Sequence, residues 1–150
     1  DRAIELGIGA GYEQESWRAF GDVRYAVLGY NSWTGTLGAD AISRPNESLI
    51  LNMGPRMQFG DQRFMSTYFG VSDRESVASG MAPYDPTGGI ASVGIVLNAE
   101  YAFTPRWGVQ ATATYDRLIG EAADSPITER GSADQFGIMF GITRQISLDF

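Results

Sequence analysis

The chain has 150 residues, no cysteine, no histidine and a net charge of −7, and all 11 of its basic residues are arginine. These absences exclude disulfides, thiolate chemistry, lysine Schiff bases and the usual histidine general base or metal ligand. The acidic balance argues against nucleic acid and anionic membrane surfaces as partners. No apolar run approaches the roughly 18 residues of a transmembrane helix.

The first predicted strand covers residues 4–12, where apolar side chains alternate with small or acidic ones. Successive side chains of a strand point to opposite faces, so the alternation separates an apolar face from a polar one. Gly7, Gly9 and Gly11 resemble a nucleotide-binding loop, but the third glycine of that motif is not at the required spacing and no helix is predicted to follow. We interpret them as strand glycines.

The same alternation predicts eight strands and no convincing helix. The later seven cover residues 17–27, 33–41, 49–59, 64–72, 93–103, 107–115 and 136–150. Pro55 predicts a local irregularity in its strand, because proline cannot donate a ladder hydrogen bond. The last strand is longer than an average soluble strand and carries Phe136, Ile138, Phe140 and Ile142 on one face.

The connections alternate in length over the second half of the chain. Residues 60–63 and 104–106 are short turns, whereas residues 72–89 and 117–134 are long and polar. Outer-membrane barrels have short periplasmic turns and longer outer loops, and they place aromatic residues near the strand ends, as Trp17 does here. We therefore predict an all-β fold in one domain, an antiparallel up-and-down transmembrane β-barrel, in contact with outer-membrane lipid.

The polar face predicts what the barrel encloses. The lumen-facing candidates are Glu5, Glu13, Arg18, Asp22, Arg24, Asp40, Arg56, Glu100 and Asp116. In a narrow barrel these charges need partners and would form a salt-bridged plug. In a wider barrel they would line a water-filled pore for small solutes or cations. The sequence leaves both alternatives open, because strand number sets the width of the lumen.

Catalysis has weak support in the sequence. Glu121, Asp124 and Glu129 could be interpreted as an acid/base pair for glycan cleavage, but nothing in the loop would raise the pKa of one carboxyl. We expect a solvated loop, no enzyme activity, no cofactor and no metal.

Several stretches resemble the MipA/OmpV family of MltA-interacting outer-membrane proteins. They are residues 51–56, 68–72, 78–80, 115–127 and 130–136, of which 115–127 (YDRLIGEAADSPI) is the most specific. The resemblance implies an outer-membrane barrel of Gram-negative bacteria. It also implies a scaffold that links a murein lytic transglycosylase to a penicillin-binding peptidoglycan synthase. The predicted strand topology makes the turns at residues 29–32, 60–63 and 104–106 the candidate periplasmic contacts.

The same resemblance implies that this chain is the C-terminal portion of a longer barrel. We therefore expect strand 4–12 to pair with strand 17–27 and not with strand 138–150. Two departures from the family pattern stand out. The family's Gly-His-Ser-Gly-like turn is Gly29-Tyr30-Asn31-Ser32 here, and the last strand has Gln145 and Leu148 where such barrels commonly have Gly and an aromatic residue.

Overall fold

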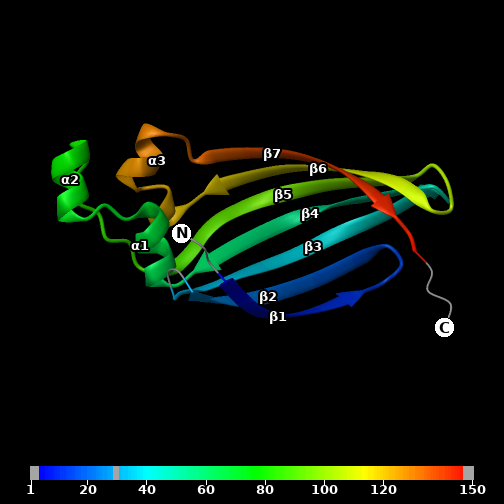
Figure 1. Cartoon of the computed structure of the whole chain (residues 1–150), viewed down its shortest axis with the longest axis horizontal. Coiled ribbons are helices and arrows are strands. Elements are labelled where there is room, and N and C mark those ends of the chain that lie inside the picture. The colour runs from blue at the N-terminus through cyan, green and yellow to red at the C-terminus, as the bar shows by residue number, and fades with distance from the viewer. Residues whose placement is uncertain (1–3, 29–30, 147–150) are drawn as a thin grey trace.

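The computed structural model describes residues 4–28 and 31–146 and contains one curved antiparallel sheet with helices at one end (Figure 1). The strands are β1 (Ile4–Glu13), β2 (Trp17–Leu28), β3 (Trp33–Asn46), β4 (Leu49–Gly60), β5 (Gly89–Ala102), β6 (Trp107–Leu118) and β7 (Asp134–Arg144). The helices are α1 (Gln62–Phe69), α2 (Asp73–Ser79) and α3 (Pro126–Arg130), with a 3₁₀ turn at Gly120–Ala122.

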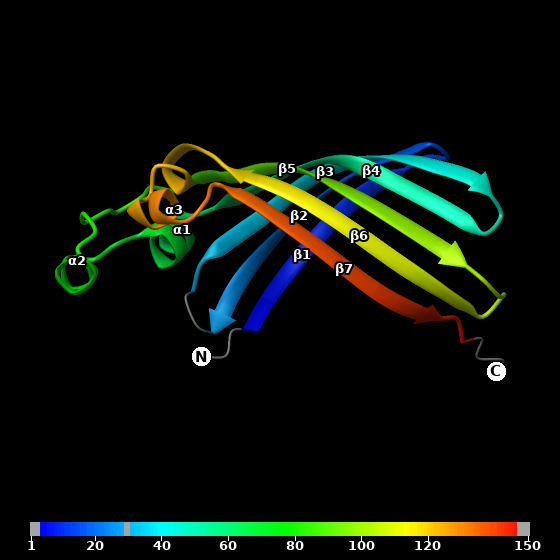
Figure 2. The same cartoon turned by 90° about the horizontal axis from the view of Figure 1, so that it is seen from above.

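The strands follow one another in the sheet in chain order, each antiparallel to the next, which confirms the predicted up-and-down topology. Seen from above, the central strands lie at the back of the curve and β1 and β7 form its two edges (Figure 2). Within the described residues β1 pairs only with β2 and β7 only with β6, so the sheet is not closed. No described helix is long and apolar enough to span a membrane.

The prediction of a strand at residues 64–72 is wrong, because this segment begins with helix α1. The side chain of Asp61 caps the helix, its Oδ1 accepting a hydrogen bond from the Phe64 N–H at 2.8 Å. The helical turn directs Met65, which is 1% exposed, against Ala91 and Ala122 in the main buried cluster. The connection between β4 and β5 is therefore one long segment that contains two helices, and the described sheet has seven strands rather than eight.

This correction changes which connections lie at the same end of the sheet. Residues 61–88 and 119–133 lie at one end of the sheet, the helical end, together with residues 31–32, which precede β3. The connections at residues 14–16, 47–48 and 103–106 lie at the other end, which we call the turn end. Of the three predicted periplasmic contacts, only 104–106 lies at the turn end. Gly29 and Tyr30 are outside the described residues, as are residues 147–150 of the predicted last strand.

The two faces of the sheet differ as the alternation predicts. On the apolar face of β7, Phe136, Ile138, Phe140 and Ile142 are each between 75% and 80% exposed. Apolar side chains of this size are unfavourable when exposed to water and are what a lipid-facing surface requires. The buried apolar residues, by contrast, gather chiefly where α1 and the 3₁₀ turn pack against β5 at the helical end.

Candidate functional site

The strand register places all nine lumen-facing candidates on one face of the sheet, the polar face. Directly paired residues of an antiparallel ladder share a face, as do residues two apart along a strand. The pairs Glu13 with Arg18 and Arg18 with Asp40 join β1, β2 and β3. The pairs Gly38 with Arg56, Arg56 with Gly94 and Gly94 with Asp116 carry the same face to β6. Whether this face lines a lumen stays a prediction.

Three of the nine candidates form an ion-paired cluster, Arg18–Asp40–Arg56, in which Asp40 and Arg56 are mostly buried and Arg18 is 39% exposed. Asp40 Oδ2 lies 2.7 Å from Arg18 Nε, and Asp40 Oδ1 lies 2.7 Å from Arg56 Nη1. The side chain of Asp40 is 1% exposed and that of Arg56 is 12% exposed. A carboxylate removed from water to this extent needs such partners, so each guanidinium offsets part of its desolvation cost.

An aromatic ring completes the cluster. The guanidinium carbons of Arg18 and Arg56 lie 5.5 and 4.8 Å from the centroid of the Phe20 ring, within cation–π range. Phe20 is on β2 and Arg56 on β4, so they meet across β3. The contact is possible because Gly38 lies between them: a Cβ there would be 2.5 Å from Phe20 Cζ and 3.1 Å from Arg56 Cδ.

The cluster also coincides with a gap in the ladder between β3 and β4. The paired positions run from Gly38 with Arg56 directly to Ala41 with Met53, so Ala39 and Asp40 have no ladder partner on β4. Pro55, which cannot donate, lies in the gap, as predicted. Gly54 allows the two strands to approach, because a Cβ there would lie 1.7 Å from the Ala39 carbonyl oxygen.

The remaining candidates are not brought into the cluster. Asp22 and Arg24 pair with each other at 2.9 Å on β2, where both side chains are partly exposed. Glu13 lies 3.9 Å from Arg44, a residue the prediction did not include. Glu100 accepts a hydrogen bond from Asn98 at 3.0 Å, and Asn98 in turn accepts hydrogen bonds from Gln110 and Thr112. The polar face is therefore ionic over β2–β4 and mostly neutral over β5 and β6.

At the helical end, hydrogen bonds join the two long connections. The Glu121 carboxylate accepts hydrogen bonds from the backbone N–H and the hydroxyl of Thr87, and the Tyr84 hydroxyl donates to the Glu121 carbonyl at 2.8 Å. Burial, with the charges of Glu121 and Asp124, raises the pKa of Tyr84. The Ser125 hydroxyl, fully buried, donates to the Phe69 carbonyl at 2.6 Å. The expected solvated loop is thus an ordered cap, in which Glu121 has a structural role.

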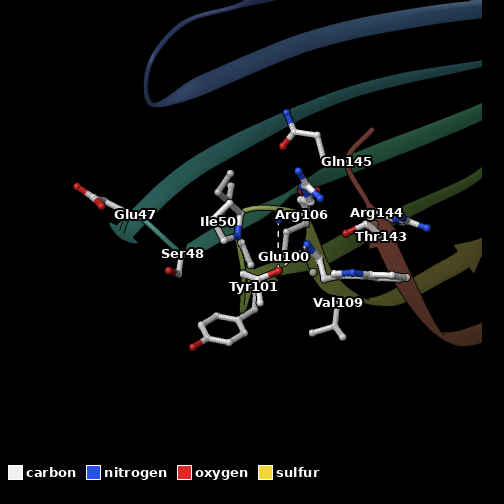
Figure 3. A pocket seen from close by; sticks show the side chains of 15 residues that line it. Glu47, Ser48, Ile50, Glu100, Tyr101, Arg106, Val109, Thr143, Arg144 and Gln145 are labelled. Atoms are coloured by element: carbon white, nitrogen blue, oxygen red, sulfur yellow. Dashed lines mark hydrogen bonds between the residues drawn. The ribbon is translucent and has the colours of Figure 1, made fainter. Parts of the chain in front are cut away.

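A second site, which the sequence did not predict, is a pocket of about 310 Å³ at the turn end (Figure 3). We call it the rim pocket; the connections at residues 47–48 and 103–106 and the end of β7 contribute its walls. Arg106 and Arg144 line it, and the Arg144 guanidinium carbon lies 5.1 Å from the centroid of the Trp107 ring. The register of β6 with β7 pairs Trp107 with Arg144, and that of β4 with β5 brings the connection at residues 47–48 beside Tyr101.

Within residues 4–28 and 31–146, no three acidic side chains come close enough together to hold a metal ion.

Comparison with known proteins gives one family. Residues 1–146 match the family model described as MltA-interacting protein MipA. The MltA-interacting protein of Escherichia coli K12 is 34% identical over 85 residues, which is 57% of this chain and 34% of that protein. The putative outer membrane protein YiaT of E. coli K12 is 28% identical over 108 residues, 71% of this chain and 42% of that protein.

A third relative, outer membrane protein Omp26La of Vibrio anguillarum, is 36% identical over 69 residues, 46% of this chain and 25% of that protein. The matches thus span between a quarter and less than half of the length of these curated relatives. No solved structure matches the chain significantly.

Proposed function

Because the chain belongs to the MltA-interacting protein MipA family, we propose that it is part of an outer-membrane β-barrel that acts as a non-enzymatic scaffold for cell-wall enzymes. Its relatives are named as outer membrane proteins, and the exposed apolar face of the sheet suits a lipid environment. The name of the E. coli relative supports a lytic transglycosylase as one partner. The second partner in the proposal is a penicillin-binding peptidoglycan synthase.

We propose that residues 1–150 form one barrel domain within a larger barrel. An unpaired strand edge in hydrocarbon leaves N–H and C=O groups without partners, at a cost of several kcal/mol each. The open edges of β1 and β7 therefore need further strands. β1 and β7 also run parallel to each other, because each strand reverses direction relative to the one before and β1 and β7 are the first and last of seven. They therefore cannot close on each other in an antiparallel barrel.

Which end of the sheet faces the periplasm determines which connections the partner enzymes can contact. Periplasmic turns of outer-membrane barrels are short and outer loops are long. The turn end is therefore the periplasmic end and the helical cap is the outer one. Cell-wall enzymes would meet the connections at residues 14–16, 47–48 and 103–106, and the earlier assignment of residues 29–32 and 60–63 to this contact is replaced.

The observation that carries the scaffold proposal is the family match, and recovery of the partners tests it. Tagged protein is purified from detergent extracts of cells, and the transglycosylase and synthase that accompany it are quantified. In a double variant, Glu15→Arg and Glu47→Arg reverse two exposed charges at the turn end. Asp73→Arg, with the charge reversed on exposed helix α2, is the matched control at the helical end.

We expect the double variant to lose most of the transglycosylase and the synthase, and the control to retain both. Equal recovery from the double variant and the wild type would contradict the contact surface. If only Asp73→Arg loses the two enzymes, the helical end and not the turn end faces the periplasm. If the wild-type protein recovers neither enzyme, the scaffold proposal is wrong.

A pore for small solutes or cations stays the alternative. The neutral polar stretch of β5 and β6 favours it, because Asn98, Gln110 and Thr112 are partly buried without ion pairs and could line a water-filled lumen. Steady channels in planar bilayers, with a cation preference that weakens in Glu100→Gln or Asp116→Asn, would support the pore. The absence of conductance would support a plugged barrel.

A further inference from the structure

The arginines of this chain fall into two groups. Within the part of the chain that the structure describes, Arg18, Arg24, Arg44, Arg56 and Arg117 each lie within 4.0 Å of a carboxylate. Arg63 and Arg130 donate to backbone carbonyls. Apart from Arg74 on α2, the described arginines without a carboxylate or carbonyl partner are Arg106 and Arg144. Both line the rim pocket.

Unpaired guanidiniums in one pocket are unusual in a chain with a net charge of −7, where carboxylates are abundant. Two acidic residues line the same pocket, yet neither pairs with these arginines. The Glu47 carboxylate points away from Arg106 (Figure 3), and Glu100 is hydrogen-bonded to Asn98 on the polar face. The arginine N–H donors are therefore available to an external acceptor.

The surroundings of these arginines indicate the kind of acceptor. Trp107, Tyr101 and Phe103 are between 41% and 52% exposed at the same end of the sheet. Aromatic rings concentrate where a membrane meets water, at the depth of the lipid headgroups. The Trp107 ring supports the Arg144 guanidinium from one face, which leaves its edge free for the paired hydrogen bonds that guanidinium makes to phosphate.

We propose that the rim pocket binds the phosphate of an anionic phospholipid headgroup in the inner leaflet of the outer membrane, through Arg106 and Arg144. The net negative charge is unfavourable for a membrane surface as a whole, but these two unpaired cations make the pocket locally favourable. The inference rests on the proposed membrane placement and orientation, not on any enzyme partner. The lipid assay below contains no transglycosylase, so its failure and that of the scaffold proposal are distinguishable.

The test counts retained lipid. Purified protein in detergent is titrated with phosphatidylglycerol or phosphatidylcholine, and bound lipid is measured by native mass spectrometry. We expect one tightly retained phosphatidylglycerol. Arg106→Gln and Arg144→Gln should each weaken the Kd about fivefold, since a basic residue near an anionic lipid surface contributes about 1 kcal/mol. Arg144→Lys, which keeps the charge without the planar fork, should weaken it less.

Arg44→Gln is the matched control, because Arg44 lies towards the same end of the sheet but outside the pocket. Its Kd should stay within twofold of the wild type. Equal retention of phosphatidylcholine by the wild type would overturn the proposal, as would unchanged Kd values in both glutamine variants. Inorganic phosphate distinguishes the source of the anion: complete displacement of the lipid at millimolar phosphate would indicate a free-anion site and would overturn the lipid assignment.

Discussion

The Arg18–Asp40–Arg56 cluster and the rim pocket use the same side chain in opposite ways. In the cluster two guanidiniums share one carboxylate that is almost completely buried. In the rim pocket two guanidiniums have no carboxylate within 4.0 Å among the described residues. The paired arginines are part of the packing of the sheet, whereas the unpaired ones are available for binding. Substitutions in the cluster should therefore change stability, and substitutions in the pocket should change binding.

The largest effect is expected from removing the shared carboxylate. Asp40→Ala leaves Arg18 and Arg56 facing each other without a counter-charge, and breaking a buried ion pair in this way costs about 3–5 kcal/mol. The free energy of unfolding is measured by urea titration in detergent. Asp22→Ala, which breaks a half-exposed pair with Arg24, is the control and should cost about 0–1 kcal/mol. Equal losses in the two variants would mean that burial does not distinguish these pairs.

A smaller loss is expected where the backbone near Asp40 is changed. The added methyl group of Gly54→Ala would lie 1.7 Å from the Ala39 carbonyl oxygen, so β3 and β4 must separate, at about 1–3 kcal/mol. Gly141→Ala adds the same methyl group on β7, where no atom lies within 4 Å, and should be neutral. Urea midpoints compare the pair, and an unaffected Gly54 variant would show that the strands adjust freely.

An intermediate loss of stability is expected at the helical end, where the buried polar group is the uncharged hydroxyl of Ser125. Ser125→Ala removes the hydroxyl that caps α3 and donates to the Phe69 carbonyl, and the loss of such a cap costs about 1 kcal/mol. Amide hydrogen exchange in α3 should accelerate about fivefold. Thr67→Ala, on the exposed side of α1, should leave exchange unchanged. Unchanged exchange in the Ser125 variant would show that the cap does not depend on this hydrogen bond.

The smallest stability effect is expected at the rim pocket. Arg106→Gln and Arg144→Gln remove no ion pair, so the free energy of unfolding should change by less than about 0.5 kcal/mol. The measurement is the same urea titration, on the same samples used for lipid binding. A loss of several kcal/mol in both variants would show that Arg106 and Arg144 stabilise the fold as Arg18 and Arg56 do, and would contradict the contrast between the cluster and the rim pocket.

The period-two alternation was sufficient to predict the strands of β1–β4 and β5–β7 and the polar face. It failed at α1, where Phe64, Tyr68 and Phe69 carry the aromatic side chains that strands favour. Two local signals favoured helices there: Asp61 as a helix cap, and the Ser72–Glu75 capping box that begins α2. Counting α1 as a strand grouped the connection at residues 104–106 with that at 60–63, whereas the structure places 103–106 and 61–88 at opposite ends of the sheet.

The candidate site was predictable only in part, for a geometric reason. Alternation shows which charges share a face, but the pairing of Arg18 and Arg56 with one carboxylate depends on register across three strands. The rim pocket depends on the register of β6 with β7 and on a connection between β3 and β4 that is far away in sequence. Neither register follows from the alternation pattern, because many alignments preserve the two faces equally well.

The residue at position 38 restricts which side chains can occupy positions 20 and 56. A side chain at position 38 would occupy the space where Phe20 and Arg56 now meet. A relative that replaces Gly38 must therefore carry a smaller residue than phenylalanine at position 20, or lose the contact between β2 and β4. Positions 20, 38 and 56 should therefore covary among relatives, although they lie on three different strands.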